Sequence, residues 1–444
     1  MHIEIHHEGS TPGKSGGRSL RGGDGAVRNV RRSAGDGQLP DHPTRLCLWD
    51  FSYGGIGVEF SLMASEHPLT AVKSLLVHPF WLVALLLAAW QYAWKNIREQ
   101  QTWGSRLSPP TPLFLRTLLV GCVAGGLISL SVSFFTLDLK PGDLIRVWIV
   151  TLVLGTFNLR LACTGIAVGI LSLLSLTARG IGAKPGILPD LSVFSAGDWL
   201  FLAGLLHLAE WFMVRLDGGA GMMPITVKVA HGRWVGGHLM RKIWPVPLLA
   251  ATPAGWLPVP LVSGFARVNL SISPEQQRRR SSSLVLVYGV GLTILTLSGV
   301  YGMPVLLWAA AVYAILGHEA LYWVGRYREI RRPPLFTPAE RGIKVLAVLS
   351  ASPAEEMGIR PGDTLLRVNG EETDSMDEVK RALQKSPAFS KLELLDEHGD
   401  PKLAQRPVYE GDPSDLGLVK APDPVAGKDA EGAPGPEPAV GRTV

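Results

Sequence analysis

Apolar residues are gathered in the middle of the chain, in segments separated by short polar stretches. The segments cover residues 75–94, 113–135, 144–157, 161–178, 199–214, 243–265, 284–300 and 304–324. Most of them approach the roughly 20 residues that an α-helix needs to cross a lipid bilayer. The pattern predicts an α-helical polytopic membrane bundle of seven to eight segments over residues 73–325, embedded in a lipid bilayer.

One apolar segment, residues 243–265, differs from the others because it contains five prolines, at positions 245, 247, 253, 258 and 260. Proline removes a backbone donor and interrupts helices. Non-helical backbone at membrane depth is tolerated where the surrounding protein buries it. We therefore expect this segment to be re-entrant or interfacial rather than a membrane-spanning helix.

Lysine and arginine in the connecting loops bear on the number of spans. The loops 95–106, 228–242, 276–280 and 326–332 are basic, and basic loops generally face the cytoplasm. All four face it only if residues 243–265 enter the membrane and return, which favours seven spans; eight spans are the alternative. In both arrangements the region after residue 332 is cytoplasmic.

The two ends of the chain are polar. Residues 1–72 are rich in glycine, arginine and serine, which predicts a disordered basic tail or a start codon assigned too early. Residues 326–340 form a basic linker, and residues 409–444 read as a disordered, mildly acidic tail.

Composition restricts the chemistry further. The net charge of +5 resides in arginines beside the apolar segments, which is typical of membrane flanks, so we expect no nucleic-acid partner. Cys47, Cys122 and Cys163 lack the spacing of a metal site or a disulfide framework. No metal and no cofactor are predicted.

The region from 341 to 408 has the punctuation of a small α+β domain. After a β-rich run, Ser352 can cap a short helix, and Gly358 can end it in a left-handed turn. The dipeptide Asn369-Gly370 offers a tight turn after the next strand. Ser375 repeats the capping signal ahead of a second, amphipathic helix.

This order of strand, short helix, strand, turn, helix and closing strands resembles a bacterial PDZ domain. We therefore expect a small α+β PDZ-like domain over residues 341–408. The resemblance implies β-augmentation, in which a partner's extended segment adds a strand to the edge of the domain. Ile343, Val345, Val379 and Leu383 would line the peptide-binding groove.

Bacterial PDZ domains usually carry another strand ahead of this point, with a glycine-containing loop that holds the carboxylate end of a ligand. The proline-rich residues 333–342 leave little room for that strand. Two alternatives stay open: the domain binds internal segments, or its fold serves only as a packing module.

His207 and Glu210 lie three residues apart in one apolar segment and therefore share a helix face. Ionisable groups at this depth suggest function, because burying them unpaired is costly. A metal site or a proton relay is one interpretation. A structural pair that hydrogen-bonds neighbouring helices is favoured, because no third ligand is evident nearby.

The string Leu216-Asp217-Gly218 is similar to a signature of site-2 intramembrane metalloproteases. Those enzymes need a His-Glu-x-x-His motif, which places two imidazoles on one helix face. Here His318-Glu319 is followed by Tyr322 at the position of the second histidine, and the order of the two motifs is reversed. We predict no catalytic residue and no enzyme, and we assign His318 and Glu319 to structural contacts within the membrane.

Arg241, Lys242 and Trp244 stand together beside the proline-rich segment. Cations and indoles of this kind favour the membrane interface, so we expect this group to anchor the chain at the lipid headgroups.

Several short strings together resemble the MinJ family of cell-division topology proteins. They are His78-Pro79, His207-Leu-Ala-Glu210, Gly232-Arg-Trp-Val-Gly-Gly237, Trp244-Pro-Val-Pro247 and Gly317-His-Glu319. The resemblance implies a polytopic scaffold at septa and poles, with MinD-like and DivIVA-like division proteins as partners.

We therefore predict a non-enzymatic membrane scaffold that recruits division proteins through a cytoplasmic PDZ-like domain and cytoplasmic loops. One alternative is a site-2-type metalloprotease with a degenerate or unrecognised zinc site. Another is a small-solute transporter, for which the proline-rich segment would be a broken helix at the membrane midplane.

Overall fold

The computed structural model describes residues 64–158, 161–182, 191–229, 233–386, 388–409 and 415–422. Most of the predicted N-terminal tail and all of the chain beyond residue 422 lie outside these residues. The same holds for Cys47 and for residues 159 and 160 of the polar break between two apolar segments.

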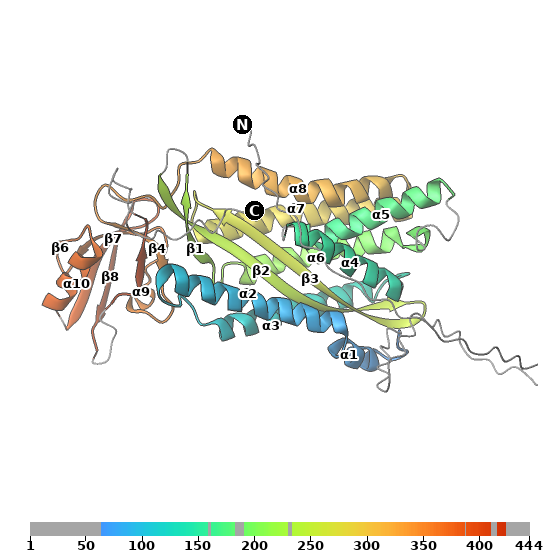
Figure 1. The fold of residues 1–444 in the computed structure, drawn as a ribbon, viewed down its shortest axis with the longest axis horizontal. Helices are drawn as coiled ribbons and strands as arrows, with labels where there is room; N and C mark the ends of the chain where they lie inside the picture. The colour runs from blue at the N-terminus through green and yellow to red at the C-terminus, as the bar shows by residue number, and fades with distance from the viewer. Residues whose placement is uncertain are drawn as a thin grey trace, which may run out of the picture. The chain divides into compact units, whose positions relative to one another are not determined.

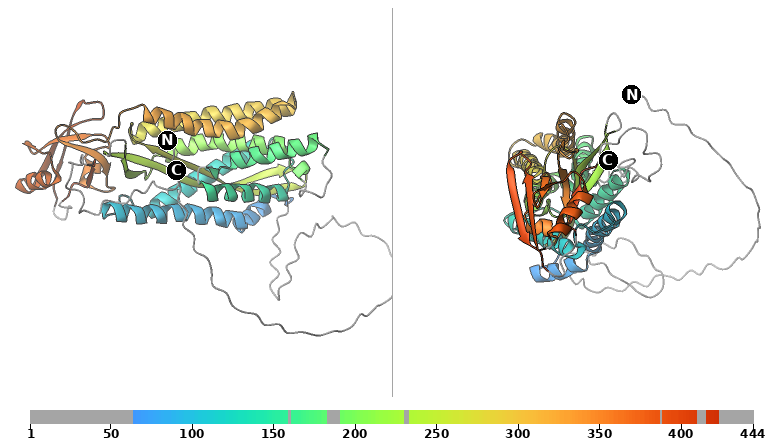
Figure 2. Two further views of the ribbon diagram at one scale, coloured as in Figure 1. Left: turned by 45° about the horizontal axis from the view of Figure 1, so that its top comes forward. Right: turned by 90° about the vertical axis from the view of Figure 1, so that its left-hand side faces the viewer.

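The apolar part of the chain folds mainly into helices (Figures 1 and 2). They are α1 (Pro68–Leu76), α2 (Pro79–Trp103), α3 (Pro110–Val132), α4 (Pro141–Phe157), α5 (Thr164–Gly180), the short 3-10 helix η2 (Leu191–Val193), α6 (Ala196–Asp217), α7 (Pro274–Tyr301) and α8 (Leu306–Ile330). Proline stands in the first turn of α1, α2, α3, α4 and α7, where its missing N–H costs nothing.

Among the described residues, the helices α3, α6, α7 and α8 are long and apolar enough to cross a membrane. The pair α1 and α2, bent by 51° at a short break, becomes a fifth if it counts as one span. The helical membrane part is therefore confirmed, whereas the count of seven to eight segments stays a prediction.

A three-stranded antiparallel sheet lies among these helices (Figure 1). Its strands are β1 (Met223–Lys228), β2 (Trp234–Thr252) and β3 (Gly255–Asn269), in the order β1-β2-β3. The proline-rich residues 243–265 are thus two arms of a long β-hairpin. Pro247 and Pro260 are paired in its register. The two backbone N–H groups that proline lacks are therefore missing at the same position of the strand pair.

Helix side chains supply hydrogen bonds to the backbone of the hairpin. The amide of Gln91 binds both backbone groups of Ile243, at 2.8 Å each. The Trp148 indole donates to the carbonyl of Pro260 at 2.9 Å. Buried backbone groups need such partners in a medium without water, and this explains how a proline-containing hairpin is accommodated among apolar helices.

Helix α3 packs against β2 through glycines. A side chain at Gly121 or Gly125 would collide with the carbonyl oxygens of Pro245 and Pro247, respectively. The two glycines therefore allow the backbones of helix and strand to approach closely. This places the hairpin inside the helical part of the protein.

The C-terminal region forms a separate sheet with two short helices. Its elements are β4 (Ile343–Val348), α9 (Pro353–Glu356), β5 (Thr364–Val368), β6 (Glu371–Glu372), α10 (Met376–Lys385), β7 (Phe389–Leu395), β8 (Pro401–Pro407) and β9 (Leu418–Lys420). The strand order is β8-β7-β5-β4-β9, with β6 paired to β5.

The predicted punctuation of this region is confirmed. Ser352 accepts a hydrogen bond from the N–H of Glu355 at the start of α9, and Gly358 follows that helix with a φ of 71°. Ser375 and Glu378 form a reciprocal capping box at α10. The sheet continues through β9 to Lys420, beyond the predicted end of the domain at residue 408.

Candidate functional site

The four residues predicted to line a peptide groove lie in the apolar core of the C-terminal domain or against it. Ile343, Val345 and Val379 are buried, and Leu383 is half-buried against the same cluster. Their side chains pack in the hydrophobic core of the domain or against it. Their role in binding a peptide stays a prediction.

Strand β9 brings a distant part of the chain to the end of this sheet. It pairs antiparallel with β4, with Leu418 opposite Val348 and Val419 opposite Ala347. Among the described strands, β9 has only this neighbour. Sequence reasoning missed it because a strand of three residues carries almost no periodic signal.

The segment just before β9 contains a glycine that the backbone requires. Gly417 has a φ of 78°, and a Cβ there would collide with Ser352. Its carbonyl accepts from the N–H of Leu349 at 2.9 Å. Leu416 and Leu418 on either side join the domain core that contains Val379.

A buried ionic cluster joins α3, α6 and β2. The carboxylate of Asp217, which is fully buried, lies 3.1 Å from Lys242 Nζ and 3.1 Å from Arg116 Nε. It also accepts hydrogen bonds from the Trp244 indole at 2.9 Å and from the Thr117 hydroxyl at 2.8 Å. We call these five residues the Asp217 cluster.

The Asp217 cluster overturns the expectation that this region anchors the chain at lipid headgroups. Trp244 is fully buried and Lys242 is 3% exposed, so both side chains point inward to the carboxylate. Arg241 stacks over Trp94 at 4.5 Å and over Trp90 at 5.2 Å. The basic and aromatic residues were correctly grouped, but the partner of Lys242 and Trp244 is an aspartate distant in the sequence.

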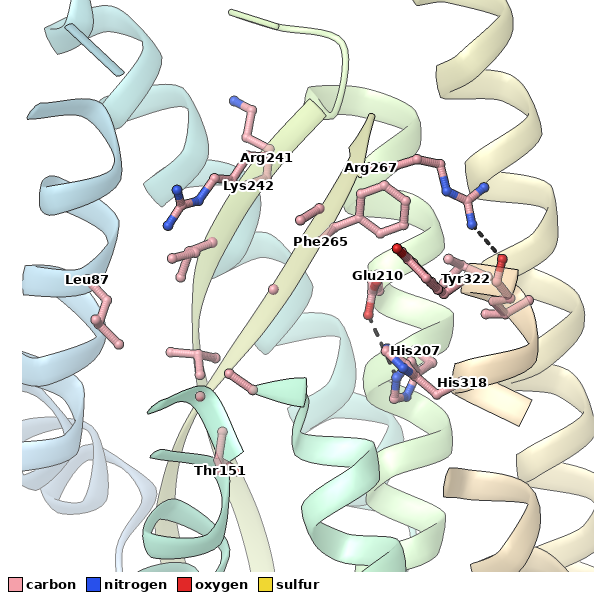
Figure 3. A pocket seen from close by; sticks show the side chains of 18 of the residues that line it. Leu87, Thr151, His207, Glu210, Arg241, Lys242, Phe265, Arg267, His318 and Tyr322 are labelled. Carbon is pink, nitrogen blue, oxygen red and sulfur yellow. Dashed lines mark hydrogen bonds and ion pairs between the residues drawn. The ribbon is translucent and has the colours of Figure 1, made fainter. Parts of the chain in front are cut away.

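A cavity of about 310 Å³ opens beside the hairpin, between helices of the membrane part (Figure 3). Its polar lining includes His207, Glu210, His318, Tyr322 and Arg267. The Arg267 guanidinium donates to the carbonyl of Leu321 at 2.8 Å. The remaining wall is mostly apolar, as is usual for sites that take small ligands.

His207 and Glu210, the two polar residues that the sequence placed on one face of α6, line this cavity. His207 Nε2 is 3.8 Å from Glu210 Oε2, and Figure 3 shows the two side chains facing each other, with His318 beside His207. Cys163, at the start of α5, brings its sulfur to 3.4 Å from His207 Nε2. Glu319, on α8, is half-buried next to His318. The structural roles predicted for these polar residues stay predictions.

Cys163, His207 and His318 offer ligand atoms that all lie within 4.8 Å of one another. We call these three residues, together with Glu210, the His207 cluster. Sequence spacing did not reveal the cluster, because its members belong to three different helices and lie far apart along the chain.

A third buried polar contact joins β2 to the C-terminal region. His238 Nε2 bonds the carbonyl of Leu346 in β4 at 2.9 Å, and Gly236 pairs with Phe336 in an isolated bridge. Burial lowers the pKa of His238 to about 4, although the bond to Leu346 opposes this shift. The imidazole is therefore neutral at physiological pH.

Comparison with known proteins gives two findings. Residues 344–395 match the PDZ domain family. The chain is also similar to the cell division topological determinant MinJ of Bacillus subtilis (strain 168), with 25% identity over 374 residues, which cover 78% of this chain and 93% of the relative.

The probable cell division topological determinant MinJ of Lacticaseibacillus paracasei is likewise 25% identical, over 81% of this chain and 100% of its own length. Each of these two matches thus covers about four fifths of the chain. These relatives are named as division determinants and not as enzymes.

Proposed function

We propose that this protein is a non-enzymatic membrane scaffold that helps to place the division site. The similarity to division topological determinants along most of the chain supports this function. The helical membrane part supplies the anchor, and the PDZ domain supplies a surface for protein partners. By resemblance, the partners are MinD-like and DivIVA-like proteins, and the protein is enriched at septa and poles.

In this proposal the PDZ domain faces the cytoplasm. The helix α8 ends in a basic stretch, with Arg326, Arg328 and Arg331 just ahead of the domain, and basic flanks are retained on the cytoplasmic side. The domain would then stand where MinD-like and DivIVA-like proteins can reach it.

The observation that carries partner binding is the position of β9. A PDZ domain captures a peptide by adding it as a strand beside an edge strand that follows a glycine-containing loop. The strand expected ahead of β4 was not found in the sequence there, but β9 occupies the sheet position next to β4. Gly417 directly precedes it. We propose that the partner's extended segment pairs with β9 on the side of this strand that faces away from β4.

Localisation and deletion test the scaffold as a whole. A fluorescent fusion of the full chain is expected at septa and poles, and deletion of the gene is expected to give long cells with misplaced septa. A chain that stops after Ile330 should still reach the membrane but fail to correct the deletion. An even membrane distribution together with normal division after deletion would refute the proposed function.

A glycine substitution tests the role of β9. Gly417→Val should distort the loop before β9, because both the positive φ and the contact with Ser352 oppose a side chain. Gly399→Val is the matched control, since Gly399 has a φ of 91° but no atom of the described residues lies within 4 Å of its Cβ position. We expect only Gly417→Val to reduce partner capture by the purified full chain; equal capture by both variants would contradict the assignment.

A further inference from the structure

The His207 cluster has the composition of a transition-metal site. A thiol and two imidazoles, contributed by α5, α6 and α8, converge beside one cavity. Sulfur and imidazole nitrogen are the ligands that zinc selects in proteins. The carboxylate of Glu210 stands next to them, on the same face of α6 as His207.

The orientation of His207 fits metal binding. Its Nδ1 lies 2.7 Å from the carbonyl of Ala203, one turn earlier in α6. A carbonyl can only accept, so Nδ1 carries the proton and Nε2 presents a lone pair toward Cys163. Metal-binding histidines are commonly held in this way by a backbone carbonyl behind the ring.

The distances also suit a tetrahedral ion. Bonds of 2.0–2.3 Å to zinc place neighbouring ligand atoms about 3.5 Å apart. Cys163 Sγ lies 3.4 Å from His207 Nε2, and Glu210 Oε2 lies 3.8 Å from the same nitrogen. All three ligand atoms of Cys163, His207 and His318 fall within 4.8 Å, so modest side-chain movement closes the set.

The surroundings hold the ring in place. A Cβ at Gly165 would collide with Cε1 of His207, so glycine at this position makes room for the imidazole. The Tyr288 ring packs edge-on against His207, with centroids 4.7 Å apart. Cys163 and His207 are buried, and His207, Glu210 and His318 line the adjoining cavity.

We propose that Cys163, His207 and His318 bind one Zn²⁺ ion, with Glu210 as the fourth ligand. On binding, the Cys163 thiol loses its proton to solvent and its sulfur forms the bond to zinc, while the two imidazoles bind as neutral bases. The ion would join α5, α6 and α8 at the cavity wall. This site is independent of peptide capture by the PDZ domain.

Metal analysis of the full chain, purified in detergent from zinc-supplemented cells, tests the proposal. The wild type should hold about one zinc per chain, and Cys163→Ser, His207→Ala and His318→Ala should each lose most of it. Cys122→Ser and His67→Ala are matched controls, because both residues are exposed. Unchanged zinc in the three variants, or none in the wild type even after incubation with excess zinc, would overturn the site.

A second measurement keeps the test decisive if a variant does not fold. Cobalt(II) added to the metal-free wild type should produce a thiolate-to-cobalt charge-transfer band, and zinc should abolish it by competition. In Cys163→Ser that band should be absent, while Cys122→Ser should retain it. Failure of the wild type to develop the band would count against a cysteine-ligated metal.

Discussion

Helix α6 carries two buried polar clusters, about three turns apart, and they are built in opposite ways. In the Asp217 cluster a single carboxylate is surrounded by cations and hydrogen-bond donors. The His207 cluster consists of groups that offer lone pairs, and it adjoins a cavity. The first cluster compensates its charge internally, whereas the second has the composition of a site that takes a cation from outside.

The largest loss of stability is expected from a substitution in the Asp217 cluster. Asp217→Ala leaves Lys242 buried without its carboxylate, which should lower the free energy of unfolding by about 3–5 kcal/mol. Unfolding of the purified protein in mixed detergent micelles measures this loss. Asp138→Asn, at an exposed pair with Lys140, should cost no more than about 1 kcal/mol; equal losses would show that Asp217 is not compensating buried charge.

A double substitution sharpens the interpretation of that loss. Lys242→Met removes the cation whose partner is Asp217, so adding it to Asp217→Asn removes both ends of the pair. We expect the sum of the stability losses in the two single variants to exceed the loss in the double variant by about 2 kcal/mol, because the effects of residues in contact are not additive. Strict additivity in the same unfolding assay would mean that the two side chains act independently.

Zinc should stabilise the protein through the His207 cluster and leave the Asp217 cluster unaffected. Free zinc at a hundred times its dissociation constant should add about 2.7 kcal/mol to the stability of the wild type. A chelator should remove this gain, and in Cys163→Ser zinc should add almost nothing. If Cys163→Ser gains as much as the wild type, zinc acts elsewhere on the protein.

The smallest effect concerns His238, a buried imidazole whose partner is a carbonyl. Its folded pKa of about 4 lies below the ordinary value of 6.5, so its contribution to stability is complete above pH 6.5. That contribution falls as the pH drops from 6.5 through 4, because the His238 imidazole is protonated at a higher pH when unfolding exposes it than when it is buried. When the pH is lowered from 7.5 to 5.5, the free energy needed to open the contact between His238 and Leu346 should fall by about 1 kcal/mol.

Hydrogen exchange of the amides in β4 at the two pH values, corrected for the intrinsic pH dependence of exchange, measures this weakening. His238→Gln should abolish the pH dependence, since an amide does not titrate in this range. His398, which is exposed on the C-terminal domain, provides the matched control: His398→Gln should leave the dependence intact.

Local signals made the C-terminal domain predictable. Its caps, glycine turns and helix face depend on residues within a few positions of one another, and Ser352, Gly358 and Ser375 all serve as the sequence indicated. The apolar helices were predictable for a similar reason, since hydropathy is a property of each segment alone.

The hairpin formed by β2 and β3 shows where local signals end. Hydropathy registers that residues 243–265 are apolar but does not distinguish a buried strand from a helix. The strand state depends on register partners such as Pro247 and Pro260, and on Gln91 and Trp148 from other helices. These partners meet only in the folded chain.

The amino-acid sequence by itself determined that the protein has apolar helices and a C-terminal domain punctuated like a PDZ domain, because both depend on neighbouring residues. Only the tertiary structure decided the proline-rich hairpin, the pairing of β9 with β4, and the meeting of Cys163 with His207 and His318. Each of these depends on contacts between segments far apart in the chain, whose closure is decided by the packing of the whole fold.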